Sequence, residues 1–314
     1  MYLEYKVIDN KYQNINQILK QEFKLSARLM HKVISNNLVL LNDMQTDTRN
    51  RPNYGDTIKV DLNYEEENDN IVSTQMKLNI LYEDNGLLIL NKPAGIAVHP
   101  SILHFEDSLS NGVRFYFDSI GLKKKIRPVN RLDLDTSGII IFAKNEYIQE
   151  CLIQQMNSHI LKKEYIAIVS GILKEKTGTI NLPISRKDGS IIERCISENG
   201  QTAITDYSVI NELNNMSVIK CVLQTGRTHQ IRVHFSAIGH PLIGDSLYGS
   251  KSDLINRQAL HSYHISFIHS ISNKVIDIYC ELPEDMKKIT NLSWYILKNL
   301  LKYLYTIKRK KDNW

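Results

Sequence analysis

The stretch from about residue 78 to residue 283 contains a succession of strand-like segments, and this succession limits the folds open to the chain. Each segment combines β-branched and aromatic residues and is bounded by turn residues. The segments are LNILYED, GLLILNK, GIIIFAK, KEYIAIVSG, TAITDYSVI, SVIKCVLQT and KVIDIYC. Few helical patterns separate them, which disfavours a repeating strand–helix–strand fold. The pattern therefore predicts an α+β fold with a mixed, largely antiparallel sheet.

A smaller α/β unit precedes this region and spans residues 1–62. The helical patterns INQILKQEF and LSARLMHKVISN come first, and Ser26 is placed to cap the second helix. The short strand patterns LVLLN and DTIKVDL follow them. On the second helix, Arg28, His31 and Lys32 would share one face. That face is either an ordinary solvated helix surface or a surface for a polyanion.

The length of 314 residues predicts about two domains. Residues 63–76 are rich in acidic and polar side chains without periodicity, which predicts a linker. Residues 77–290 would form the large domain. The pattern of residues 291–314 predicts a C-terminal amphipathic helix followed by a basic tail. This segment could pack on the large domain, contact RNA or fray.

The amino-acid composition indicates in which cellular compartment the protein acts and which kinds of partner it could bind. The formal net charge is +5 and the isoelectric point about 8.8, which suits a polyanionic partner without requiring one. The four cysteines contain no C-x-x-C pair, which disfavours a zinc site or a disulfide framework and favours the reducing cytoplasm. No apolar run is long enough to cross a bilayer. We therefore expect a cytoplasmic protein without membrane contacts, acting as a monomer.

The segment NRLDLDTSGIIIFAK, residues 130–144, places charges directly before a buried strand. In an extended chain Arg131, Asp133 and Asp135 would point one way, and Leu132 and Leu134 would anchor the opposite side in the core. A carboxylate beside an arginine is stabilised in its charged form and can serve as a nucleophile or a base. The alternative is a structural arginine–carboxylate cluster at a strand entry. The spacing does not choose between the two aspartates.

The segment LQTGRTHQIRVHFSAIGHPLIGDSLYG, residues 223–249, predicts a helix capped by Thr228 and ended by Gly239. Arg232 would lie in its first turns, free to meet a carboxylate or a phosphate. The histidines His229, His234 and His240 lack the spacing of metal ligands. Capping, packing and hydrogen-bonding roles are therefore expected for them.

Two further segments carry polar side chains that could face a ligand. KKEYIAIVSG alternates so that Lys163, Tyr165, Ala167 and Val169 share a side. Its tyrosine could stack on a base or lie half-buried in the sheet. LYEDNGLLILNKPAGIAVHPS predicts a hairpin turn at EDNG. We expect a scaffolding role for this second segment, although Lys92 and His99 could face a ligand.

Together these motifs resemble the RluA-type family of pseudouridine synthases, and most closely the ribosomal branch that includes the D-type enzyme. ILYEDNGLLILNKPAGIAVHP, NRLDLDTSGIIIFAK, KEYIAIVSG and TGRTHQIRVHFSAIGHPLIGD resemble four motifs of that family in the same order. The resemblance covers nearly the whole chain. Residues 1–62 resemble an S4-type RNA-binding module, for which Arg28 and Lys32 would contact RNA.

The resemblance implies roles for individual residues. It makes Asp133 the essential aspartate and Arg232 its basic partner. It makes Tyr165 the residue that contacts the target base, and Arg131 the residue that helps to displace the target nucleotide. The chain departs from the pattern at Asn130, where the family usually has histidine, and at Gln224, where an acidic residue is frequent.

The implied reaction is isomerisation of uridine to pseudouridine in RNA, with 23S ribosomal RNA as the first candidate substrate and transfer RNA as another. Nothing is added or oxidised, so no cofactor and no metal is expected. Asp133 could attack C1′, stabilise an oxocarbenium-like sugar or remove a sugar proton. The alternative is a non-catalytic ribosomal-RNA-binding or chaperone protein. A glycoside hydrolase using Asp133 and Asp135 is disfavoured, because two residues on one extended segment do not flank a sugar.

Overall fold

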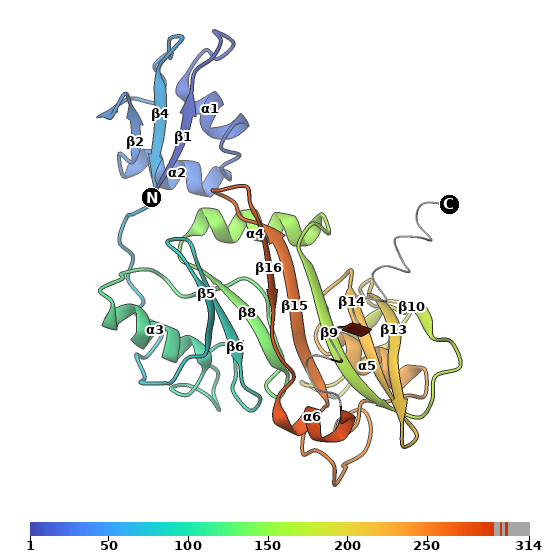
Figure 1. Cartoon of the computed structure of the whole chain (residues 1–314). Helices are drawn as coiled ribbons and strands as arrows, with labels where there is room; N and C mark the ends of the chain where they lie inside the picture. The colour runs from blue at the N-terminus through green and yellow to red at the C-terminus, as the bar shows by residue number, and fades with distance from the viewer. Residues whose placement is uncertain (292–295, 297–298, 301–314) are drawn as a thin grey trace.

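The computed structural model describes residues 1–291, 296 and 299–300. The predicted C-terminal helix and basic tail, residues 291–314, lie almost entirely outside these described residues. The α+β fold with a largely antiparallel sheet is confirmed (Figure 1). No helix among the described residues is both long enough and apolar enough to cross a membrane.

The N-terminal unit is a four-stranded antiparallel sheet in the order β1-β4-β2-β3, covered by two helices. Its elements are β1 (Tyr2–Lys6), α1 (Ile15–Gln21), α2 (Ala27–Ser35), β2 (Val39–Leu41), β3 (Met44–Gln45) and β4 (Thr57–Asp61). Ser26 caps α2 as predicted, because its hydroxyl accepts a hydrogen bond from the Leu29 amide at 3.2 Å. Leu29 and Val33 are buried, and the sheet and helices share one apolar core.

The large sheet has ten strands, eight of them in the order β10-β13-β14-β9-β15-β8-β6-β5, with β16 paired to β15 and β7 to β8. Its strands are β5 (Ile80–Glu83), β6 (Leu87–Lys92), β7 (Arg127–Pro128), β8 (Ser137–Ala143), β9 (Lys162–Ser170), β10 (Thr177–Asn181), β13 (Ile204–Leu213), β14 (Met216–Leu223), β15 (Leu260–Ile268) and β16 (Val275–Tyr279). A separate hairpin joins β11 (Ile184–Arg186) to β12 (Arg194–Ile196). Among the described strands, β8 and β15 form the one parallel pair.

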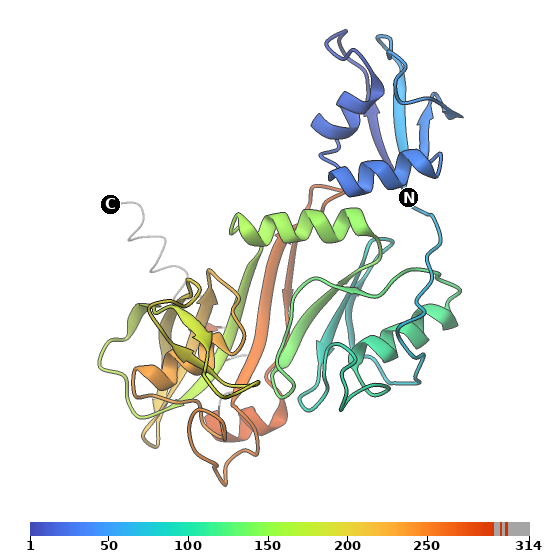
Figure 2. The same cartoon turned by 180° about the vertical axis from the view of Figure 1, so that it is seen from behind.

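Helices cover both faces of this sheet (Figure 1, Figure 2). They are α3 (Leu109–Ser119), α4 (Glu146–Asn157), α5 (Gln230–Ala237) and α6 (Glu284–Thr290). Because side chains alternate along a strand, Ile140 and Phe142 of β8 pack in one cluster with α3 and α5. Ile139 and Ile141 pack with α4 on the opposite face. Leu132, in the polar segment that precedes β8, belongs to the same cluster as residues of α3 and α5.

Gly138 is required where β8 passes β15. Its φ is +111°, and a Cβ there would lie 2.1 Å from the carbonyl oxygen of Ser262. Gly138→Ala is expected to lower the free energy of unfolding by about 3 kcal/mol, because it adds backbone strain to a clash with a backbone atom. Urea unfolding measures this loss.

Gly239 provides the matched control for that prediction, because its φ is +83° but a Cβ would meet nothing within 4 Å. Gly239→Ala should cost about 1 kcal/mol, from backbone strain alone. Equal losses in the two variants would show that the close approach of β8 and β15 does not constrain residue 138.

Candidate active site

The segment that leads into β8 is a fixed loop rather than an extended strand. The Thr136 amide donates to the Asp133 carbonyl at 3.1 Å, which makes a turn. This turn corrects one prediction: Leu132 is buried in the core as expected, but Leu134 is 40% exposed. The carbonyl of Leu134, not its side chain, anchors the loop.

Buried cations hold that loop by its backbone carbonyls. The Lys92 ammonium is fully buried and donates to the carbonyls of Pro93 at 2.9 Å, and of Ile96 and Leu134 at 2.8 Å. Burial lowers the pKa of Lys92 to about 7. On the other side of the loop, Arg257 donates to the carbonyl of Asp135 at 3.0 Å. These bonds fix the backbone on both sides of Asp133.

Asn130 has a structural role at the start of this loop. It is buried, and its amide group donates to the Ile139 carbonyl at 3.2 Å and accepts from the Ile141 amide at 2.9 Å. An asparagine side chain presents a donor and an acceptor together, so it can bridge two backbone groups on the edge of β8. This accounts for the residue where the resemblance led us to expect histidine.

Asp133 meets Arg232 across the loop. One carboxylate oxygen of Asp133 lies 3.4 Å from Nη1 of Arg232, and the Asp133 side chain is 24% exposed. The structure thus brings together the two residues that the sequence predicts as a pair. The predicted position of Arg232 in the first turn of α5 is also confirmed. The helix begins after His229 and not after Thr228, because His229 has a left-handed φ of +58° and takes the N-cap position.

Arg232 is held from behind by Asp245, a residue to which the sequence analysis gave no role. Its Nε and Nη2 donate to the two carboxylate oxygens at 2.7 and 2.9 Å, and Asp245 is fully buried. Burial would raise the pKa of Asp245, but hydrogen bonds and charge from Arg232 hold that pKa below its usual range. Two backbone amides, of Leu247 and Tyr248, also donate to Asp245. The signal in the sequence was a lone aspartate in an otherwise apolar and glycine-rich segment.

His229 and Tyr248 complete the wall around the carboxylate. Nε2 of His229 lies 4.0 Å from Asp133, and its Nδ1 is 2.8 Å from the hydroxyl of Tyr248. The Tyr248 ring lies 5.0 Å from the Arg232 guanidinium carbon. Burial lowers the pKa of His229 although Asp133 acts in the opposite direction, so the imidazole is neutral at neutral pH.

Tyr165 lies on β9 beside this cluster. It is 4% exposed and packs with Ala167 and Val169, as the alternation predicts. Burial, together with the negative charge of Asp133, raises the pKa of the Tyr165 hydroxyl, which stays protonated at neutral pH. Arg131 is exposed. The burial of His99 lowers the pKa of that histidine, and the charge of Arg131 lowers it further.

The remaining predicted residues lie elsewhere. Arg28 is exposed and lies 3.2 Å from Glu146, whereas Lys32 contacts Glu66 at 2.8 Å and Glu146 at 3.2 Å. His234 and His240 make hydrogen bonds to Thr205 and to the Ser170 carbonyl. Within the described part of the chain, no three His, Cys, Asp or Glu side chains gather in a way that could hold a metal.

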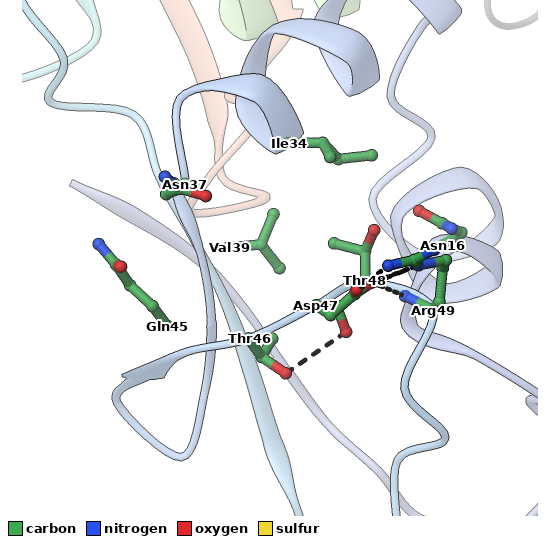
Figure 3. Close-up of a pocket in the computed structure, with 9 residues that line it drawn as sticks. All are labelled: Asn16, Ile34, Asn37, Val39, Gln45, Thr46, Asp47, Thr48 and Arg49. Atoms are coloured by element: carbon green, nitrogen blue, oxygen red, sulfur yellow. Dashed lines mark hydrogen bonds and ion pairs between the residues drawn. The ribbon is translucent and has the colours of Figure 1, made fainter.

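Two shallow hollows lie away from Asp133. One, of about 670 Å³, lies beside the loop that precedes β8 and is lined by Lys92, Ser137 and Arg257 among others. The other, of about 630 Å³, is on the N-terminal unit, where Arg49 is paired with Asp47 (Figure 3). Lys92 and Arg257 in the first hollow and Arg49 in the second already bind protein groups. Chemistry on a ligand is therefore best supported at Asp133.

The cluster around Asp133 can stabilise or attack an electron-poor carbon. It offers a partly exposed carboxylate, an arginine that is fixed by a second buried carboxylate, and a protonated tyrosine beside them. Charges that are held in place before the reaction stabilise developing charge without reorganisation. Such an arrangement suits cleavage of a glycosidic bond at a sugar C1′.

Comparisons with known proteins point to one family. Residues 86–237 match the family model described as RNA pseudouridylate synthase. The RNA pseudouridine synthase YhcT of Bacillus subtilis is 40% identical over 274 residues, which are 87% of this chain and 90% of the relative. The ribosomal large subunit pseudouridine synthase D of Zymomonas mobilis is 38% identical over 225 residues, 67% of this chain and 71% of the relative.

The fold agrees with these sequence matches. The solved structure of human RNA pseudouridylate synthase domain containing 1 superposes with a TM-score of 0.54 at 26% identity. The match covers 65% of this chain and 83% of that one.

Proposed function

The chain belongs to the RNA pseudouridylate synthase family, and on this premise we propose that Asp133 is the carboxylate with which it isomerises uridine in RNA. The observation that carries the proposal is the contact between Asp133 and Arg232, the arginine that Asp245 holds from behind. Arg232 and Tyr165 are the proposed substrate-binding residues at the reacting base and sugar. The proposed substrate is large-subunit ribosomal RNA, after which the Zymomonas relative is named.

The reaction needs only groups that this cluster offers. The C1′–N1 bond of uridine breaks, the uracil rotates, and C5 bonds to C1′; C5 then loses its proton while N1 gains one. Asp133 supplies a negative charge next to C1′, as a nucleophile or as a stabiliser of the cationic sugar. Tyr165 supplies an aromatic face for the uracil. The hydroxyl of Tyr165 is protonated, so it must pass its own proton to another group before it can accept the proton that C5 loses.

The target base must leave its stack before Asp133 can reach its sugar, at a cost of a few kcal/mol. Arg131 lies exposed two residues before Asp133, where its guanidinium can enter the vacated space. We propose that it offsets part of this cost by stacking on the neighbouring bases.

We further propose that the N-terminal unit, residues 1–62, is an S4-like RNA-binding domain. Its exposed cations include Lys20, Lys24 and Arg51, besides Arg28. Phosphate contacts by these cations would make affinity fall with salt concentration. The four cysteines are free thiols, which supports action in a reducing cytoplasm.

The test is a map of pseudouridines in the ribosomal RNA of a strain that lacks this gene. We expect one or a few large-subunit uridines to stay unmodified, and to be modified again when the wild-type gene returns. A strain that carries an Asp133→Asn gene should behave like the deletion. An unchanged map of ribosomal RNA, with the loss found in transfer RNA instead, would contradict the proposed substrate.

A further inference from the structure

The N-terminal unit rests on the large domain through α4. Helix α2 lies above one end of α4 in both views (Figure 1, Figure 2). Tyr147 of α4 and Ile271, from the turn between β15 and β16, pack against the core of the N-terminal unit. The Ser26 hydroxyl donates to Glu150 at 2.7 Å. The two units therefore share apolar and polar contacts and are not joined by a tether alone.

Glu66, in the segment that the sequence predicts as a free linker, is buried between the two units. Its side chain is 4% exposed, and its two oxygens accept from Arg127 at 2.6 and 2.7 Å. Lys32 of α2 donates to it at 2.8 Å. Burial alone would raise the pKa of Glu66, but hydrogen bonds from Arg127 and Lys32 bring it to about 2. Glu66 thus remains charged and joins a cation from each unit.

Glu146 adds a second link to the same lysine. It is the first residue of α4, and it meets Lys32 and Arg28 of α2, each at 3.2 Å. Lys32 therefore bridges the linker and the large domain. The two cations that the sequence analysis assigned to RNA contact are thus engaged with carboxylates of this chain.

The linker backbone is fixed beside this bridge. The Lys124 ammonium donates to the carbonyls of Leu62 at 2.8 Å and Tyr64 at 2.6 Å. The ammonium groups of Lys32 and Lys124 lie 4.3 and 4.8 Å from the centre of the Tyr64 ring. The Glu66 amide donates to the Lys123 carbonyl at 3.0 Å. These contacts leave the predicted linker little freedom.

From this network we propose that Glu66 is a specificity-determining positioning residue, which holds the N-terminal unit at a fixed place relative to Asp133. The proposal rests on the proposed function. An RNA that touches both units must then span a set distance, so the N-terminal unit selects among uridines in structured RNA. A short stem-loop that reaches only Asp133 does not touch the N-terminal unit, so the fixed position of that unit does not change its binding.

The test compares Glu66→Gln with Glu65→Gln in the full chain. Glu65 is the neighbouring acid, but it is exposed, and its ion-pair partner among the described residues is exposed Lys123 at 3.1 Å. Hydrogen exchange of residues 62–72 should become about tenfold faster in Glu66→Gln and stay unchanged in Glu65→Gln. For a ribosomal RNA fragment that reaches both units, KM should rise about tenfold in Glu66→Gln only. Turnover of a minimal stem-loop should not change.

Lys32→Gln is a second variant that tests the same contact if Glu66→Gln does not fold. It leaves the Arg127–Glu66 pair intact and should accelerate exchange in the same segment. Wild-type exchange rates in both variants, or faster exchange with unchanged KM on the long RNA, would overturn the proposal. Absence of turnover by the wild type on either RNA would instead overturn the proposed function, and the specificity claim with it.

Discussion

Replacing Asp245 with asparagine is expected to lower the free energy of unfolding by about 3 kcal/mol and the isomerisation rate by about 100-fold. Asp245 is fully buried and binds two guanidinium nitrogens of Arg232. When the charge of Asp245 is removed, Asp133 is the carboxylate that remains in contact with the buried Arg232. The guanidinium of Arg232 should then turn toward Asp133 and shift the Asp133 carboxylate from the position seen in the structure. Urea unfolding and single-turnover rates measure the two effects.

Asp285→Asn is the matched control for Asp245→Asn. Asp285 also holds an arginine with two bonds, since Arg257 donates to it at 2.7 and 3.0 Å, but its side chain is 40% exposed. Its loss should cost about 1 kcal/mol, because Asp285 is open to water and Arg257 keeps its hydrogen bonds to the carbonyls of Asp135, Gln258 and Leu260. If Asp245→Asn were as stable and as active as Asp285→Asn, the account of how Arg232 is positioned would be wrong.

Much of the sheet could be predicted from the sequence, because most of its strands show clear apolar patterns. Besides β7 and β10, the strand that these patterns did not predict is β15, which lies at the centre of the sheet. It contains His261, Ser262 and His264, which are buried and therefore hide the apolar pattern of a core strand. His261 is satisfied by the Ser137 hydroxyl at 2.9 Å and His264 by Asp277 at 2.6 Å. Such polar residues can be buried only when side chains from other strands and loops form hydrogen bonds with them.

The candidate site was predictable in part. The pairing of Asp133 with Arg232 followed from the motifs, and both residues lie together. The support behind them did not follow, because it comes from distant segments. Lys92 holds the loop through the carbonyl of Leu134, and Asp245 holds Arg232 from beyond the end of α5. Alternation along an extended chain placed Leu134 in the core, whereas the turn at Asp133 exposes it.

The linker was the least predictable segment. Residues 63–76 have the composition of a solvated connection, and the structure gives them no helix or strand. Composition does not reveal that Glu66 finds cations in two different units. A charged residue is buried when partners far away in the sequence compensate it, and a single sequence does not display such partners.

Asp133→Asn is expected to have the largest effect of any single substitution on turnover. The change keeps the shape of the side chain but removes the charge that we propose acts at C1′, so the isomerisation rate should fall at least about 1,000-fold. RNA affinity should change by less than about threefold, because ground-state binding depends on surfaces beyond this carboxylate. Filter binding measures the affinity. Asp135→Asn is the control in the same loop, and it should keep nearly full activity because Arg257 binds the backbone of Asp135.

The most direct measurement is tritium release from ribosomal RNA labelled at C5 of uridine, since C5 gives up its hydrogen only after it has bonded to C1′. Wild type and Asp135→Asn should release tritium in proportion to the uridines modified. Asp133→Asn should release no more than a reaction without enzyme. Release by Asp133→Asn at the wild-type rate would show that Asp133 does not carry the reaction.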